Sequence, residues 1–119
     1  MDSNGYNPSI MQRTQGCYFC HKGGDLARHE VFFGVGTRKL SKMLGLWVHV
    51  CPVCHSRVHD EITYCIKDGK PYTYDDKLKD DGEMVYKMHY TVPFEDVFGK
   101  GIIKPWEIEE LVKEYDDGR

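Results

Sequence analysis

Two pairs of closely spaced cysteines constrain the fold of this chain more than any other feature. Cys17 and Cys20 form one pair, and Cys51 and Cys54 form the other, each with two residues between the thiols. Four thiolates arranged in this way make the tetrahedral ligand set that structural zinc prefers. Residues 21–50, between the pairs, leave room for a strand, a loop and a second strand. We therefore expect one structural zinc ion, bound by all four cysteines.

Three histidines form a second group of candidate metal ligands. His55 follows Cys54 directly, and His59 lies one helical turn later, so both imidazoles can point the same way. His29, on a predicted strand after the first cysteine pair, is the natural third ligand. Three imidazoles can hold a divalent cation, such as Mg²⁺ or Mn²⁺, and leave positions open for water and phosphate. The alternative is that these are ordinary polar residues of a helix and a strand.

The charge of the chain is distributed unevenly. Residues 1–59 carry seven Lys and Arg against three acids, a balance of +4, whereas residues 60–119 carry nine against sixteen, a balance of −7. The first part can meet phosphate, and the second would repel it. The alternative is that these charges only solvate two surfaces. The bases assigned to nucleic-acid phosphate are Arg38, Lys39, Lys42 and Arg57.

The length of 119 residues fits one domain, preceded by a polar N-terminal stretch. Residues 1–16 predict a flexible arm, and residues 17–119 a single domain. Within that domain we expect a zinc core over residues 17–66 and an acidic extension over residues 67–119. No apolar run is long enough for a membrane span, and the start does not resemble a signal sequence. A cytoplasmic location is therefore expected, where reduced thiols favour zinc over disulfides.

Hydrophobic patterning predicts an α+β fold. Strands are expected at residues 26–33 and 46–50, with a short helix at residues 38–44 between them. A helix opened by Pro52 is expected to run to about Ile66, with Cys65 buried. The remaining expected elements are a hairpin that pairs residues 72–74 with the alternating stretch at residues 84–92, and a helix that starts at Pro105.

The ordered motifs resemble a known family over about residues 17–62. The layout of a first Cys-x-x-Cys, a strand, a loop, a second strand and a Cys-x-x-Cys-His that opens a helix is similar to zinc-bearing HNH (ββα-metal) nucleases. The stretches HEVFFG, RKLS, GLWV and CP resemble more closely small phage proteins related to RecA-dependent recombination-enhancement nucleases. The acidic C-terminal part lies outside this resemblance.

The resemblance implies metal-dependent cleavage of a phosphodiester bond in DNA within a host cell. His55 and His59 match metal ligands of the family. His29 matches a third ligand, and Glu30 stands where the general base is a histidine in the family. The opposite assignment, with His29 as base and Glu30 as a ligand or a structural residue, stays open, and His49 is a further candidate. An asparagine of the family pattern has no counterpart in the expected stretch, where Leu46 lies near its usual place.

Two readings without catalysis compete with the nuclease. In one, the zinc core carries a degenerate site, and the acidic C-terminal half binds and inhibits a host protein by imitating nucleic acid. In the other, the chain is a zinc module that binds DNA without cutting it. Cleavage that depends on a divalent ion and on His55 would separate the nuclease from both.

Overall fold

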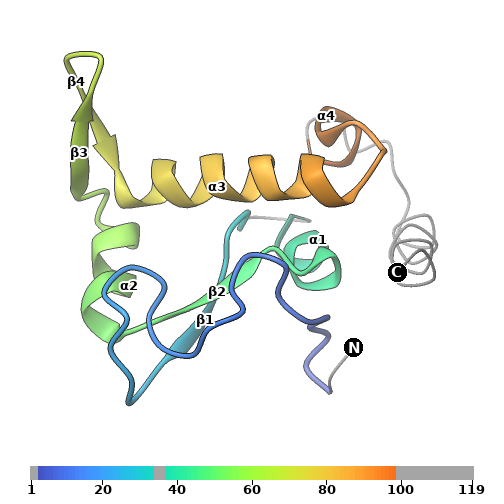
Figure 1. The fold of residues 1–119 in the computed structure, drawn as a ribbon, viewed down its shortest axis with the longest axis horizontal. Coiled ribbons are helices and arrows are strands. Elements are labelled where there is room, and N and C mark those ends of the chain that lie inside the picture. The colour runs from blue at the N-terminus through green and yellow to red at the C-terminus, as the bar shows by residue number, and fades with distance from the viewer. Residues whose placement is uncertain (1–2, 34–36, 99–119) are drawn as a thin grey trace.

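The structure, a computed structural model, describes residues 3–33 and 37–98. It combines helices with two separate two-stranded antiparallel sheets, which confirms the predicted α+β class (Figure 1). In chain order the elements are β1 (Ala27–Glu30), α1 (Thr37–Leu44), β2 (Trp47–Val50), α2 (Pro52–His59), β3 (Thr63–Lys67), β4 (Lys70–Thr73), α3 (Tyr74–His89) and α4 (Phe94–Phe98).

The part of the chain that holds the paired cysteines folds as its pattern predicts. β1 and β2 pair so that Ala27 faces Val50 and Glu30 faces Trp47, with α1 between them in the chain. The buried side of α1 includes Met43 and Leu44, as expected for its helical spacing. Both strands and α1 are therefore confirmed. The strands are shorter than expected, and α1 starts one residue earlier, at Thr37.

The N-terminal stretch differs from the flexible arm that its composition predicts. The backbone N–H of Ile10 donates to the Gly45 carbonyl at 2.9 Å, and Trp47 Nε1 donates to the Asn7 carbonyl at 2.8 Å. Ser9 Oγ donates to the Trp47 carbonyl, and the Gln12 side chain accepts from the His49 N–H. The polar residues thus satisfy the edge of β2 that β1 leaves open, and the prediction of a loose arm is wrong for these residues.

The helix after the second cysteine pair is shorter than expected. α2 ends at His59, and Glu61 takes a left-handed φ of 55° that a continuing helix does not allow. Residues 63–73 then form the β3–β4 hairpin, whose turn places Asp68 and Gly69 at φ of 54° and 75°. An Asp-Gly turn is a strong hairpin signal that the helical interpretation overlooked. Cys65 consequently lies exposed on β3, where a buried position was expected.

A long helix replaces the predicted hairpin at residues 72–92. Thr73 and Asp76 form a reciprocal capping box that starts α3. The buried positions are Leu78, Gly82 and Tyr86, which recur every four residues and so form one helical face. Met84 and Met88, which suggested a strand face, are exposed. The helix expected from Pro105 lies outside the described residues.

Gly82 explains how α3 packs closely on the part of the chain that holds the paired cysteines. A Cβ at this position would lie 3.1 Å from side-chain atoms of both Val31 and Phe32. The absent side chain lets the helix approach the segment that follows β1, at the cost of a poor helix former. Figure 1 shows α3 running across this half of the molecule, with the β3–β4 hairpin projecting from its start. Across residues 3–33 and 37–98, no helix has the length and apolar character to cross a membrane.

Candidate metal centres

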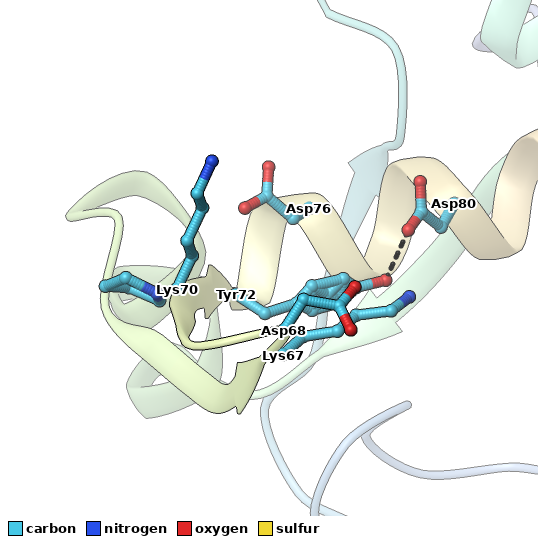
Figure 2. A pocket seen from close by; sticks show the side chains of 7 residues that line it. Lys67, Asp68, Lys70, Tyr72, Asp76 and Asp80 are labelled. Carbon is cyan, nitrogen blue, oxygen red and sulfur yellow. Dashed lines mark hydrogen bonds between the residues drawn. The ribbon is translucent and has the colours of Figure 1, made fainter.

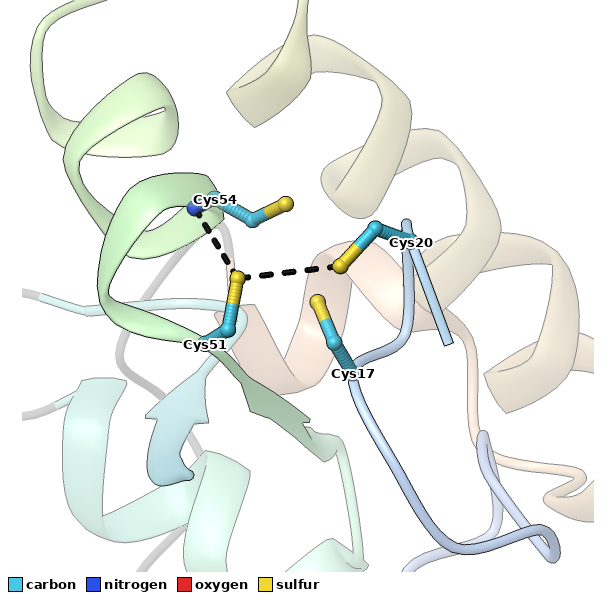
Figure 3. Close-up of side chains that lie close together, drawn as sticks. All are labelled: Cys17, Cys20, Cys51 and Cys54. Carbon is cyan, nitrogen blue, oxygen red and sulfur yellow. Dashed lines mark hydrogen bonds between the residues drawn. The ribbon is translucent and has the colours of Figure 1, made fainter. Parts of the chain in front are cut away.

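The four paired cysteines converge on one point (Figure 3). Their sulfur atoms all lie within 4.8 Å of one another, and Cys20 Sγ is 3.7 Å from Cys51 Sγ. Four sulfurs at about 2.3 Å from a tetrahedral zinc ion would be about 3.8 Å apart. The cluster therefore has the dimensions of a four-thiolate metal site, as the spacing predicted, and it can bind a metal such as zinc.

Local backbone geometry places these thiols. Cys17 donates its N–H to the Lys22 carbonyl, and its own carbonyl accepts from His21, which closes a tight knuckle. His21 adopts a left-handed φ of 65°, and its side chain is exposed, as expected for a surface histidine. On the other side Cys51 is the N-cap of α2, and its sulfur accepts the Cys54 N–H at 3.4 Å.

The pKa values of the clustered thiols favour a bound cation. The Cys54 N–H lowers the pKa of the Cys51 thiol. Burial opposes ionisation of Cys17, but backbone N–H groups outweigh it and bring the pKa of that thiol to about 6. Burial and the neighbouring Cys17 raise the pKa of Cys54 far above its usual range. The four thiols cannot all ionise beside one another, so a divalent cation is what makes four thiolates compatible.

The three candidate histidines form a second cluster. His55 Nε2 and His59 Nε2 are 2.9 Å apart on α2, and the rings of both lie 5.4 Å from the His29 ring on β1. One nitrogen from each imidazole lies within 4.8 Å of the other two. The structure therefore brings together the three residues that sequence reasoning grouped, and they can hold a metal ion.

His29 is the least satisfied member of this cluster. Its side chain is 3 % exposed, and its Nε2 is buried without a hydrogen-bond partner. Burial, followed by the charges of His55 and His59, lowers the pKa of His29 to about 4. Burial and His59 also lower the pKa of His55. The lowered pKa values of His29 and His55 favour the neutral imidazole, which is the state that metal coordination requires.

The other two candidates for base or ligand lie apart from the imidazoles. Glu30 accepts a hydrogen bond of 2.6 Å from the Tyr6 hydroxyl and lies 3.9 Å from the Lys42 ammonium. Since Glu30 follows His29 on β1, its side chain points to the opposite face of the strand. His49 is the cross-strand partner of Arg28 and stacks edgewise on Trp47, so it shares that opposite face.

The predicted phosphate-binding bases do not form one group. Arg38 and Lys39 are exposed on α1, and Lys42 lies 4.9 Å from the centre of the Tyr6 ring. Arg57 lies instead on α2, beside Tyr74. Sequence reasoning missed Arg28, whose guanidinium lies 4.4 Å from the Tyr6 ring centre. The available signal was that Arg28 directly precedes His29 on a predicted strand. Neighbouring strand residues face opposite sides, so Arg28 lies on the face away from the imidazoles, where Lys42 also lies.

Two hollows lie near these elements. One, of about 360 Å³, adjoins the thiol cluster and is bordered by Lys22 and Arg57. The other, of about 450 Å³, lies between the β3–β4 hairpin and α3, where Tyr72 donates to Asp80 at 2.6 Å (Figure 2). Lys67 and Lys70 line the second hollow together with carboxylates. The hydrogen bond from Tyr72 to Asp80 connects the hairpin to α3.

Comparisons with known proteins assign no function to this site. No family model, no curated protein and no solved structure matches this chain.

Proposed function

We propose that this protein is a metal-dependent endonuclease of the HNH type that hydrolyses phosphodiester bonds in DNA. The observation that carries the proposal is the imidazole cluster of His29, His55 and His59, with its buried and unpartnered His29 nitrogen. The cluster joins a two-stranded sheet to the helix that also carries Cys51 and Cys54. This strand, strand and helix order around a thiol cluster agrees with the resemblance to HNH nucleases.

The three imidazoles suit phosphodiester chemistry because they fill only part of a coordination shell. A divalent ion bound there would polarise the scissile phosphate and stabilise the leaving oxygen. The role of the chain is to hold three neutral nitrogen donors in one place. His29 is rigid because it is buried on a paired strand, whereas His59 is exposed and leaves the site open to a substrate.

The match to the family position proposes Glu30 as the general base and His29 as the alternative, although the Glu30 side chain lies on the face of β1 opposite the imidazoles. Glu30 accepts a hydrogen bond from the Tyr6 hydroxyl and lies 3.9 Å from the Lys42 ammonium. This environment suits a carboxylate that positions Tyr6 and Lys42 near phosphate. Glu30→Gln therefore tests the assignment directly: lost cleavage supports Glu30, and retained cleavage transfers the role to another group.

A cationic and aromatic surface on the face of β1 opposite His29 is proposed to contact the DNA backbone. Arg28 and Lys42 lie over the Tyr6 ring, with Trp47 beside them. Guanidinium and ammonium groups contact phosphates, and aromatic rings can stack on unpaired bases. Trp47 is buried, so the half-buried Tyr6 is the ring that such stacking would use. The expected signature is DNA affinity that falls steeply with salt and weakens in an Arg28→Ala variant.

The arrangement of α3 gives less support to the hypothesis that the acidic half binds a host protein by imitating nucleic acid. Its carboxylates form i, i+4 ion pairs on the helix itself, with Lys77 to Asp81 at 3.0 Å and Lys79 to Asp75 at 2.8 Å. Asp81 also accepts from Tyr18, and Asp80 from Tyr72. These carboxylates are therefore partly neutralised and committed to internal contacts, which reduces the unpaired charge available to a partner.

The deciding experiment is nicking of supercoiled plasmid with added Mg²⁺, Mn²⁺ or Ni²⁺. Wild type is compared with His55→Ala and with the control His21→Ala, which changes an exposed histidine outside the cluster. Nicking that requires the ion, disappears in His55→Ala and persists in His21→Ala supports the proposal. A folded protein that holds its thiolate metal and nicks with none of these ions would refute it and favour the partner-binding reading.

A further inference from the structure

We propose that Asp75, on the first turn of α3, is an outer-shell carboxylate of the imidazole site and holds a water bound to its ion. The inference rests on the proposed metal site of His29, His55 and His59. Asp75 lies outside residues 17–62, the stretch that resembles HNH nucleases. It belongs to the acidic part of the chain, for which the sequence gave no settled role.

Two orphaned atoms lead to this assignment. Among the described residues, the buried side-chain nitrogen and oxygen atoms without a hydrogen-bond partner are His29 Nε2 and Asp75 Oδ1. With the proton on Nδ1, the first atom offers a lone pair to a cation, and the second is an acceptor without a donor. A buried acceptor left unpaired costs on the order of 1–3 kcal/mol, so a native protein normally satisfies it. A metal ion bound by His29 Nε2 would satisfy the first atom, and a water molecule on that ion would donate a hydrogen bond to the second.

A chain of contacts through Lys79 and Phe33 connects Asp75 to the imidazole cluster. The other carboxylate oxygen of Asp75 pairs with Lys79 at 2.8 Å. The Lys79 ammonium lies 5.2 Å from the centre of the Phe33 ring, and that ring lies 5.4 Å from His29 and 5.5 Å from His59. The charge of Asp75 also acts on His29, where it opposes the effect of burial on the pKa of the imidazole.

The geometry favours a role through water over direct ligation. The ligand atoms that lie within 4.8 Å of one another come from the three imidazoles, and the Asp75 carboxylate is not among them. A water bound to a metal ion is a strong hydrogen-bond donor, and a carboxylate that accepts from it orients it and stabilises the ion. Such outer-shell partners typically contribute about 10–100-fold to metal affinity or activity. Asp75 is therefore a positioning residue of the site.

The ion pair with Lys79 provides a matched control. Asp75→Asn removes the charge and weakens the acceptor, and it also breaks the pair with Lys79. Lys79→Met breaks the same pair but leaves the carboxylate in place. If Asp75 merely stabilises α3 through its lysine, the two variants should behave alike. If it serves the ion, only the first should alter the imidazole site.

The test is calorimetric titration of Co²⁺ into protein whose thiolate site is already filled with zinc, together with the visible spectrum of bound cobalt. Asp75→Asn should bind Co²⁺ about 10–100-fold more weakly and shift the spectrum, whereas Lys79→Met should match wild type. Equal affinity in Asp75→Asn and wild type, or equal losses in both variants, would overturn the inference. Cobalt binding by wild type without plasmid nicking would instead refute the proposed nuclease alone, and no cobalt binding that depends on His55 would overturn both.

Discussion

The thiol cluster and the imidazole cluster share helix α2 but differ in how completely they surround an ion. Cys54 and His55 are neighbours in the chain, yet each belongs to a different cluster. The thiol cluster has four donors, enough to fill a tetrahedral shell; Cys17, Cys51 and Cys54 are each at most 8 % exposed, and Cys20 is exposed. The imidazole cluster has three donors, whose burial falls from His29 through His55 to His59. One site is closed and the other is open on one side.

This difference indicates a division of labour along one helix. A saturated thiolate site has no position for a substrate, so its contribution is to the folding of the core. Buried residues around it, such as Val48, Val50 and Val58, pack into the same cluster as the cysteines. An unsaturated imidazole site adds little to folding but can bind an exchangeable ion and its substrate. The following predictions test whether the two clusters separate in this way.

The largest effect should come from opening the closed site. Cys51→Ser removes a thiolate and the acceptor of the Cys54 N–H at the start of α2. Metal binding at structural zinc sites supplies about 10–16 kcal/mol of folding free energy, which is as large as the whole free energy of unfolding of most domains. The variant should therefore lose its bound zinc and its cooperative thermal transition, as measured by elemental analysis and circular dichroism. A folded, metal-free Cys51→Ser protein would contradict the closed-site assignment.

The open site should respond in the opposite way. His55→Ala should keep the thiolate metal and melt close to wild type, because His55 is only partly buried. It should lose the second ion and lower the nicking rate by about 100-fold or more, as expected when several kcal/mol of charge stabilisation disappear. Metal stoichiometry after dialysis, thermal melting and plasmid nicking report the three properties separately. Unfolding of His55→Ala would show that the two clusters are one structural unit.

The pH dependence of stability should reveal the buried imidazole. The pKa of His29 is lowered from the ordinary histidine value of 6.5 to about 4, by burial first and by His55 and His59 next. Between these values the unfolded chain binds more protons than the folded chain, so acid destabilises the fold. From about pH 7.5 to about pH 5.5 the free energy of unfolding should fall by about 1 kcal/mol through this group. Chemical denaturation of wild type and His29→Gln at both pH values should show a loss that is larger in wild type by about this amount, because the lowered pKa of His55 contributes in both proteins.

The smallest effect should come from the fifth cysteine. Cys65 is exposed on β3, outside both clusters. Cys65→Ser should leave the metal content unchanged and alter the free energy of unfolding by less than about 0.5 kcal/mol, as for most surface substitutions. It is therefore the matched control for Cys51→Ser. Loss of zinc in this variant would show that the exposed thiol exchanges with the cluster.

Sequence reasoning succeeded where a local rule decides the geometry. The Cys-x-x-Cys spacing closes a knuckle through a few backbone hydrogen bonds, and the i, i+4 spacing of His55 and His59 follows from the helical period. It failed at residues 74–89, where Met84 and Tyr86 alternate as in a strand but form part of α3. Capping by Thr73 and packing of Gly82 on Val31 decide that segment, and the second of these is a long-range contact.

By itself, the sequence determined the donor atoms: paired thiols and a helical histidine pair are set by spacings of two to four residues, over which backbone geometry is nearly fixed. Only the tertiary structure decided which residues complete the open site. The β1–β2 pairing turns His29 toward α2 and Glu30 away from it, because neighbouring residues of a strand face opposite sides. The packing of α3 then places Asp75 where its charge acts on His29. Such meetings depend on the burial of distant apolar surfaces, which no local spacing encodes.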